Sequence, residues 1–499
     1  MDWCNNRFLR ATVAGVALGI GFVVPPLWPA AILGLLLTFD LLKSSHWSIA
    51  DIALGWWLIT VKALFSVSFF FSVYPITWLG FSLGPLEPYL IAFYWLTAAI
   101  WIGFGGAVLF SLFAGLRRLF SERVVLLTTP LLFVVSEIVG ALSFSVMTYG
   151  PGGSVNIAYS YGMIGYHLAD HQLLLHGAHL AGAYSLTALI VLVALVAWWL
   201  QQQQKRVLLI LYVLVIVGTS VGTIPIDTET KTPSTVTVAT IDTTFPKAWW
   251  YTATGSAAID AAQQAMVTAA LQSEPDYLVL PEDGRFVPQQ TASATQAWLD
   301  WAWAGRSTVL VDSGRAVVDD QPVLQSVVYD GLTQELSQSQ KRYLVPQGEF
   351  LPYFYEAILR LSGNQAAIDF LEEKLEFRVT DDVSQADYSD RAPGVLFCFE
   401  SNYPLAVHTL LRERPDGFPF VAHVVSHAWF NDSPVLRHQL EAMLQAQAVW
   451  NDVYIVVAAN HAPGYTITPR GTILIPDPIA SGPHWELRQV TIPLPGDSE

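Results

Sequence analysis

The sequence predicts two parts with different folds: a polytopic α-helical membrane bundle in residues 1–224 and an α/β domain in residues 225–499. The chain has 499 residues, of which 53% are apolar and only 13% charged, which is too apolar for an ordinary soluble protein. Its long uncharged runs all lie between about residues 8 and 224. Beyond residue 234, strand-like and helix-like patterns alternate, which is typical of an α/β domain.

Seven apolar runs are each near the ~20 residues that a helix needs to cross a bilayer. They lie at about 8–24, 27–42, 50–79, 88–116, 123–147, 172–200 and 206–224. Arg7 and Arg10 precede the first run, as in a signal peptide, but Pro25, Pro26 and another apolar run follow without a small-residue cleavage pattern. We therefore expect about seven spans, with the first one retained as an anchor.

Basic residues in the loops predict the orientation of the bundle. If the runs cross the membrane in turn, eight basic residues fall on one side: Arg7, Arg10, Lys43, Arg117, Arg118, Arg123, Lys205 and Arg206. Loops 76–87 and 148–171 contain neither Lys nor Arg. The positive-inside rule makes the basic side cytoplasmic, and an odd number of spans then places residues 225–499 outside. We expect a multi-pass protein of the cell (inner) membrane whose second domain is extracytoplasmic or periplasmic.

Charge and cysteine content exclude several classes of protein. Residues 1–223 carry nine basic and seven acidic residues, which leaves 16 basic and 34 acidic residues in the remainder. A net charge near −18 disfavours nucleic acid as a partner, because phosphate binding needs a basic surface. Cys4 and Cys398 are the two cysteines and are too far apart in the pattern to suggest a disulfide framework, so we expect a free thiol at Cys398.

Ionisable residues inside the apolar half have two interpretations. Lys62, Glu137 and a cluster rich in histidine invite a functional reading, since buried charges in a membrane are costly; the cluster is His167, Asp170, His171, His176 and His179. Alternatively, these groups lie at the membrane interface or form hydrogen bonds within the bundle. No spacing fixes a third metal ligand, and no dinucleotide or P-loop glycine pattern is present, so we expect no metal and no cofactor.

Three polar residues stand at the ends of apolar strands in the second part. Glu282 follows YLVLP, Lys341 precedes RYLVPQGEF, and Cys398 follows GVLF. A carboxylate can take a thiol proton, and an ammonium can stabilise a thiolate or a tetrahedral oxyanion, so the set suggests covalent acyl chemistry. Singly, each has an ordinary explanation as a cap, a solvated charge or a small core residue.

Four blocks of sequence resemble the nitrilase (carbon–nitrogen hydrolase) superfamily in order and approximate spacing: LVLPE, KRYLVPQGEFLP, VLFCFE and SHAWFND. The fit is closer to its membrane-embedded branch, the apolipoprotein N-acyltransferases, in which a polytopic bundle precedes an extracytoplasmic nitrilase-like domain. This resemblance covers nearly the whole chain and implies a four-layer αββα sandwich for residues 225–499.

The resemblance also implies roles for individual residues. Glu282 would be the general base, Lys341 the oxyanion stabiliser and Cys398 the nucleophile. Supporting positions would be Glu349, Glu400 and the backbone at Phe399. Three aromatic residues, Trp249, Trp429 and Phe430, are candidate walls of the substrate pocket, although core packing or an interfacial anchor explains them equally well.

The implied reaction moves an acyl chain from a phospholipid, through a Cys398 thioester, to the N-terminal amine of a diacylglyceryl-cysteine lipoprotein or lipopeptide. The chain departs from the family pattern around the site, at Gln347, Phe399, Ser426, His427 and Trp450, and lacks an apolar run near residue 499. Two alternatives therefore stay open: a membrane-tethered amidase with water as acceptor, and a catalytically silent membrane scaffold. We expect the protein to be a monomer.

Overall fold

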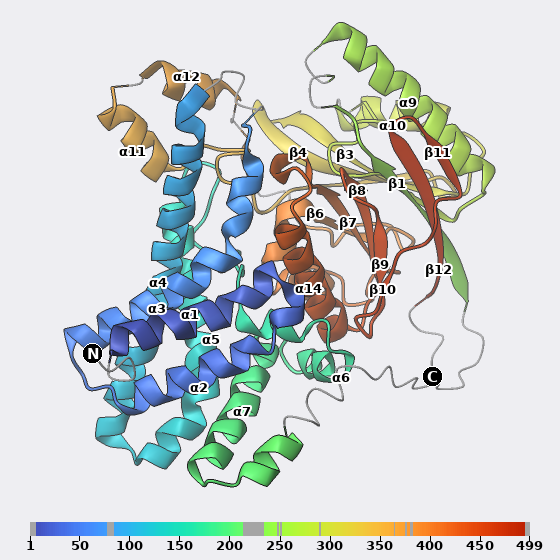
Figure 1. Ribbon diagram of the computed structural model, residues 1–499. Helices are drawn as coiled ribbons and strands as arrows, with labels where there is room; N and C mark the ends of the chain where they lie inside the picture. Colours follow the sequence, from blue (N-terminus) through green and yellow to red (C-terminus); the bar gives the residue numbers. More distant parts are fainter. Residues whose placement is uncertain are drawn as a thin grey trace.

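The computed structural model describes residues 6–76, 84–212, 234–246, 249, 252–288, 291–363, 365–374, 377–379 and 383–494. A helical bundle and an α/β domain lie side by side, and the chain passes from one to the other once (Figure 1). The predicted boundary between residues 224 and 225 lies outside the described residues and stays a prediction.

Within the described residues, six helices of 14 or more residues form the bundle: α1 Arg7–Val23, α2 Ala30–Lys43, α3 Ile49–Ser66, α4 Glu87–Leu119, α5 Glu122–Met147 and α7 Ala183–Gln202. Short turns of helix connect them: η2 Pro25–Leu27, η3 Ser68–Val73, η4 Gly84–Leu86, η5 Ile164–Leu168, α6 Gln172–Leu175 and η6 His176–His179. Polar caps start two of the long helices, because the side chains of Asn6 and Ser48 accept backbone N–H groups of α1 and α3.

Five segments of the described chain are long and apolar enough to cross a membrane: Pro25–Lys43, Ile49–Val73, Gly84–Leu119, Glu122–Met147 and Ala183–Gln202. The protein is therefore a multi-pass membrane protein by the length and composition of its helices. Each of the five corresponds to one of the seven predicted runs.

Two predicted runs are not among these five. The run 8–24 is the helix α1, which has 17 residues and ends before Pro25, because proline cannot continue a helix. The run 206–224 lies mostly outside the described residues, which stop at Tyr212 in this region. The sixth run also needs correction: residues 172–179 form two short turns, and α7 begins only at Ala183, after Gly182 with a φ of +58°.

The basic loops gather at one end of the bundle. Arg117 donates to the carbonyl of Lys43 at 2.7 Å, and Lys43 lies 3.7 Å from Glu122, so the ends of α2 and α4 meet the start of α5. The opposite end of α3 contacts the α/β domain, where Gln439 donates to the carbonyl of Ser66 at 2.8 Å. The basic end thus points away from the α/β domain, as the predicted orientation requires, and the side of the membrane stays a prediction.

Twelve strands are present in the described part of the α/β domain: β1 Thr235–Thr243, β2 Tyr277–Val279, β3 Val309–Val318, β4 Gln321–Asp330, β5 Glu335–Gln340, β6 Gly394–Phe397, β7 Val421–Ser426, β8 Ile455–Asn460, β9 Tyr465–Ile467, β10 Ile473–Leu474, β11 Ala480–Gly482 and β12 Trp485–Pro493. They pair in two groups, β11-β12-β1-β2-β3-β4-β5 and β6-β7-β8-β9-β10, which are joined by a single bridge between Thr243 and Asn460.

Helices cover the outer faces of the two groups. They are α9 Ala253–Gln272 and α10 Ala292–Ala302 on one side, and α13 Ala406–Glu413 and α14 Pro434–Asn451 on the other. Along β1, Val238 packs between the two strand groups and its neighbour Ala239 packs under α9, as the two-residue period of a strand requires. This confirms the predicted four-layer αββα arrangement, and Figure 1 shows α14 between the strands and the bundle.

The bundle and the α/β domain share one apolar core. Side chains of α14, including Leu440, Met443 and Ala446, are buried in the same cluster as those of α1 to α7. Two further helices, α11 Tyr353–Leu361 and α12 Gln365–Lys374, lie beside the first turns of α4, where Tyr355 packs edge-on against Tyr94 at 4.6 Å. The catalytic-looking domain is therefore built onto the bundle.

Candidate active site

Three strand ends bring the predicted triad to one edge of the domain. Glu282 lies three residues after β2, and Lys341 and Cys398 directly follow β5 and β6. Strands β2 and β3 are parallel, and β5 runs with them because two antiparallel pairings separate it from β3. Strands β6, β7 and β8 are parallel to one another and to β1. The carboxyl ends of all these strands thus meet at the same edge, where α/β folds place ligands.

Lys341 is the centre of a buried charge cluster. Its side chain is fully buried, and its Nζ lies 2.9 Å from Glu282 Oε1 and 2.7 Å from Glu349 Oε1. Burial lowers the pKa of Lys341, but the carboxylates of Glu282 and Glu349 outweigh it and raise the pKa above its ordinary value. Lys341 is therefore a fixed ammonium with its donors aimed at carboxylates.

Glu349 is held in place by the turn that carries it. Its Oε2 accepts the backbone N–H of Val345 at 2.8 Å, and its own N–H donates to the Val345 carbonyl at 2.9 Å. Burial raises the pKa of Glu349, with the ammonium of Lys341 opposing the shift. Gln347 within this turn has a φ of +64°, so the turn reverses sharply and returns Glu349 to Lys341.

Cys398 is a free, half-buried thiol at the start of η8 Cys398–Asn402. Its Sγ lies 3.8 Å from the Ser426 carbonyl, and His423 Nε2 lies 3.3 Å from the carbonyl of Cys398. Burial, and after it the charge of Glu282, raises the pKa of the Cys398 thiol well above its usual value, while Lys341 acts in the opposite direction. Cys398 is thus a neutral thiol at rest, and the charge of the Glu282 carboxylate contributes to keeping it protonated.

Glu400 links the segment that carries Cys398 to the segment that carries Lys341. Its Oε2 accepts the N–H of Phe397 at 2.9 Å, and its Oε1 accepts the N–H of Arg342 at 2.5 Å. Burial raises the pKa of Glu400, and these two backbone donors oppose the shift. The predicted supporting position is therefore a bridge between the residue before Cys398 and the residue after Lys341.

A loop of the bundle contacts η8, the short helix that begins at Cys398. The ring of Phe399 packs edge-on against Tyr159 at 5.3 Å, and Ser160 donates to the carbonyl of Asn402 at 2.6 Å. A cavity of about 210 Å³ lies beside this contact, between bundle residues 148–159 and domain residues 342–350. Its lining includes Arg342 and Phe399, the neighbours of Lys341 and Cys398.

Sequence reasoning missed Tyr159 and Ser160. A signal was present, because the loop 148–171, which has neither Lys nor Arg, is rich in tyrosine and glycine, but nothing in its pattern indicates a contact with η8.

The three aromatic candidates lie in two different places. Trp249 packs near Phe245 and His484, at 6.2 Å and 4.7 Å between ring centroids, on the side of the sheet covered by α9. Phe430, in η9 Ala428–Phe430 with Trp429, packs edge-on against Phe69 of the bundle at 5.3 Å. Phe430 thus lies at the boundary with the bundle, and the predicted pocket role of all three stays a prediction.

The histidine-rich cluster has structural contacts. His167 Nε2 lies 3.0 Å from the carbonyl of Leu18, and His171 caps α6. Within the described residues, no group of three or more His, Cys, Asp or Glu side chains could hold a metal ion.

The comparisons with known proteins concern the α/β half. No protein-family model matches the chain, and no curated protein matches its sequence. Solved structures that are similar include Nit3 of Saccharomyces cerevisiae, a member of branch 10 of the nitrilase superfamily, at 14% identity and a TM-score of 0.37, covering 53% of this chain and 93% of Nit3. XC1258 of Xanthomonas campestris is a CN-hydrolase superfamily protein with an arsenic adduct in its active site. It is similar at 13% identity and a TM-score of 0.36, covering 53% of this chain and 91% of XC1258.

A third similar structure is the glutamine-dependent NAD+ synthetase of Acinetobacter baumannii, at 14% identity and a TM-score of 0.35 over 52% of this chain and 46% of that one. Each of these matches covers about half of this chain, and the αββα arrangement rests on the chain's own strand pairing and helix packing. The reasons for assigning a reaction to this chain therefore come from its own side chains.

Proposed function

We propose that the protein is a membrane acyltransferase that moves a fatty acyl chain from a phospholipid, through a thioester on Cys398, to an amine. One observation carries the proposal: a buried ammonium, Lys341, is held between the carboxylates of Glu282 and Glu349 at the strand edge where the neutral Cys398 thiol lies. A base, a cation and a nucleophile at one strand edge of a domain that packs on a membrane bundle suit acyl transfer from a lipid.

In the first step the Glu282 carboxylate takes the thiol proton of Cys398, and the sulfur attacks the ester carbonyl of the phospholipid. The carbonyl oxygen gains a negative charge, which the Lys341 ammonium and the backbone N–H at Phe399 would stabilise. The intermediate then expels the lysophospholipid alkoxide, which receives the proton from Glu282. The products are the Cys398 thioester and a lysophospholipid.

In the second step an amine attacks the thioester carbonyl. Glu282 accepts a proton from the attacking nitrogen, the carbon–sulfur bond breaks, and the proton returns to the Cys398 sulfur. The product is an amide, and the enzyme regains its starting state. An N-terminal diacylglyceryl-cysteine of a lipoprotein or lipopeptide is the acceptor that the sequence resemblance favours.

The site's surroundings favour an amine over water as acceptor. Phe399 is in contact with Tyr159 of the bundle, and Phe430 with Phe69, so aromatic rings lie where the α/β domain meets the bundle. Low water access protects a thioester from hydrolysis. A membrane-tethered amidase would use the same three residues, which makes the acceptor the decisive question.

The test supplies the purified protein with a phospholipid that carries an isotope-labelled acyl chain and with a diacylglyceryl lipopeptide. One lipopeptide has a free N-terminal amine, and its matched control is N-acetylated. We expect labelled amide only with the free amine and only with intact Cys398. Release of labelled free fatty acid at the same rate with both peptides would instead assign water as the acceptor and overturn the transferase proposal.

A further inference from the structure

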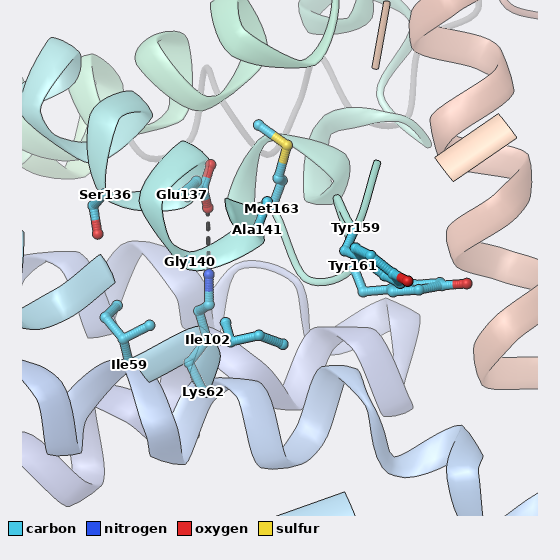
Figure 2. A pocket seen from close by; sticks show the side chains of 10 residues that line it. All are labelled: Ile59, Lys62, Ile102, Ser136, Glu137, Gly140, Ala141, Tyr159, Tyr161 and Met163. Carbon is cyan, nitrogen blue, oxygen red and sulfur yellow. Dashed lines mark hydrogen bonds and ion pairs between the residues drawn. The ribbon is translucent and has the colours of Figure 1, made fainter. Parts of the chain in front are cut away.

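A buried ion pair lies inside the helical bundle, apart from the triad. Lys62 of α3 and Glu137 of α5 are 3.3 Å apart, and their side chains are 3% and 6% exposed. Figure 2 shows the pair in a pocket that Tyr159 and Tyr161 also line, with the tyrosine hydroxyls pointing away from the pair. A cavity of about 10 Å³ separates these groups, enough for about one water molecule.

Glu137 uses both carboxylate oxygens to join separate parts of the bundle. Its Oε1 accepts from Lys62 Nζ and, at 2.7 Å, from the backbone N–H of Ile164. Its Oε2 accepts from Thr187 Oγ1 of α7 at 2.6 Å. One carboxylate on α5 therefore fixes α3, α7 and the first residue of η5.

The residues just before Ile164 contact the helix that carries the nucleophile. Ser160 donates to the carbonyl of Asn402, the last residue of η8, and Gly162 donates to Gln439 Oε1 of α14 at 3.0 Å. The fixed point at Ile164 and the contact at Ser160 are four residues apart. We name residues 159–164 the docking segment.

Fold stability alone does not explain a charge at this place. Apolar side chains of similar volume would pack the interior of the bundle without the desolvation cost of a buried ion pair. A hydrogen-bond acceptor at this position can hold the N–H of Ile164 and the hydroxyl of Thr187 in place, and an apolar side chain cannot. The bond from Ile164 fixes the end of the docking segment, and the bond from Thr187 fixes Glu137 itself against α7.

We infer that Glu137 is a positioning residue for the active site: it holds the docking segment against η8 and so sets the place of Cys398 relative to Lys341. The inference rests on the proposed function, since it assigns to the bundle a part in the reaction of Cys398. It identifies the physical link by which the membrane half acts on the catalytic half.

The test compares three paired variants in which no unpaired charge is left in the bundle. Lys62→Met with Glu137→Ala removes the charges and the acceptors. Lys62→Met with Glu137→Gln removes the charges but keeps one acceptor oxygen. The matched control is Arg10→Met with Asp40→Ala, which removes another bundle ion pair of 3.3 Å. Asp40 accepts a hydrogen bond from the Trp198 side chain of α7. Trp198 lies 11 residues beyond Thr187, or about 16 Å along that helix, so the control ion pair is remote from Glu137.

The measured quantity is the rate constant of Cys398 acylation at saturating phospholipid, taken only from molecules that react, so that a misfolded fraction does not affect it. We expect the alanine pair to slow acylation by about tenfold or more, with the half-saturating phospholipid concentration little changed. The acylation rate constant of the glutamine pair should lie within about threefold of that of the unmodified protein. The rate constant of the control pair should equal that of the unmodified protein.

Equal rates for the alanine pair and the control pair would overturn the inference, as would a change confined to the half-saturating lipid concentration. If the alanine pair does not fold, Thr187→Val removes one bond to Glu137 without touching a charge. A rate unchanged by Thr187→Val would then be the contradicting result. If even the unmodified protein forms no acyl adduct, the proposed function fails, and the alkylation rate of Cys398 by iodoacetamide decides this inference alone: equal rates in all variants overturn it.

Discussion

Lys341 is the residue on which the charge balance of the site depends. Two buried carboxylates, Glu282 and Glu349, face its ammonium, so removing that ammonium leaves two like charges close together with no compensation. We expect Lys341→Met to abolish acyl transfer and to destabilise the fold by about 3–5 kcal/mol. Denaturant unfolding measures the second effect.

A surface lysine provides the control for Lys341. Lys43 pairs with Glu122 at 3.7 Å, and both side chains are more than 40% exposed. We expect Lys43→Met to cost less than about 1 kcal/mol, because exposed ion pairs contribute little. Similar losses for the two variants would contradict the claim that Lys341 is the compensating charge of a buried cluster.

Replacing Glu282 should change two reaction rates of Cys398 in opposite directions. The charge of Glu282 contributes to the raised pKa of the Cys398 thiol, so Glu282→Gln should lower that pKa and speed alkylation by iodoacetamide at about pH 8. The same substitution removes the proposed base and should slow acylation by phospholipid by about 100-fold or more. Parallel changes of the two rates would contradict the role of Glu282 as base.

The turn after β2 is the element that aims Glu282. Asp283 and Arg285 have φ values of +58° and +52°, and the buried Asp312 holds this turn by accepting the N–H of Val287 at 2.8 Å. Burial raises the pKa of Asp312 to about 7, although the bond from Val287 opposes the shift. The turn is therefore a strained element whose anchor titrates near neutral pH.

A carboxyl group whose pKa is raised by folding stabilises the protein below its unfolded pKa and loses this contribution as the pH rises through the folded value. For Asp312 the loss falls between about pH 4 and about pH 7. We expect the melting temperature of Asp312→Asn, minus that of the unmodified protein, to increase as the pH is raised from about 5 to about 8. A difference that is independent of pH would contradict this account.

At the scale of elements, the ends of the strands could be predicted from the sequence, but the contacts between the bundle and the α/β domain could not. Glu282 and Cys398 each follow a short apolar run, a local pattern that indicates a strand and the edge where it stops. The contact of Ser160 with Asn402 joins residues 242 positions apart, and no periodicity of either segment encodes it. The start of α7 was misplaced for a similar reason, because Gly182 interrupts a continuous apolar run by its backbone conformation.

The whole molecule depends on a joint core between its two halves. Gln439 of α14 is almost fully buried and bonds the bundle twice, donating to the Ser66 carbonyl and accepting from the Gly162 N–H. We expect Gln439→Leu to leave both backbone groups unpaired and to destabilise the protein by about 2–4 kcal/mol. Thermal unfolding of the detergent-solubilised protein tests this.

The control for Gln439 is Gln365, an exposed residue at the start of α12 whose side chain bonds only to Asp369 among the described contacts. We expect Gln365→Leu to change stability by less than about 1 kcal/mol. Equal melting temperatures for Gln439→Leu and Gln365→Leu would show that the two halves are not coupled through α14.

Composition alone separated the two halves of the molecule. The long apolar runs before residue 225 and the alternating patterns after residue 234 predict a bundle and an α/β domain, and both are present. The contact between the two halves could not be predicted from the sequence. It depends on buried polar side chains such as Gln439, and glutamine is a residue type that is usually exposed.

The central claim is that Cys398 forms a thioester with a phospholipid acyl chain. The most direct measurement is the intact mass of the purified protein after incubation with phospholipid, followed by peptide mapping. We predict a mass increase of one acyl chain on the unmodified protein, located at Cys398, absent from Cys398→Ala and delayed in Glu282→Gln. An unmodified mass under conditions where the lipid binds, or the same adduct on Cys398→Ala, would contradict the account.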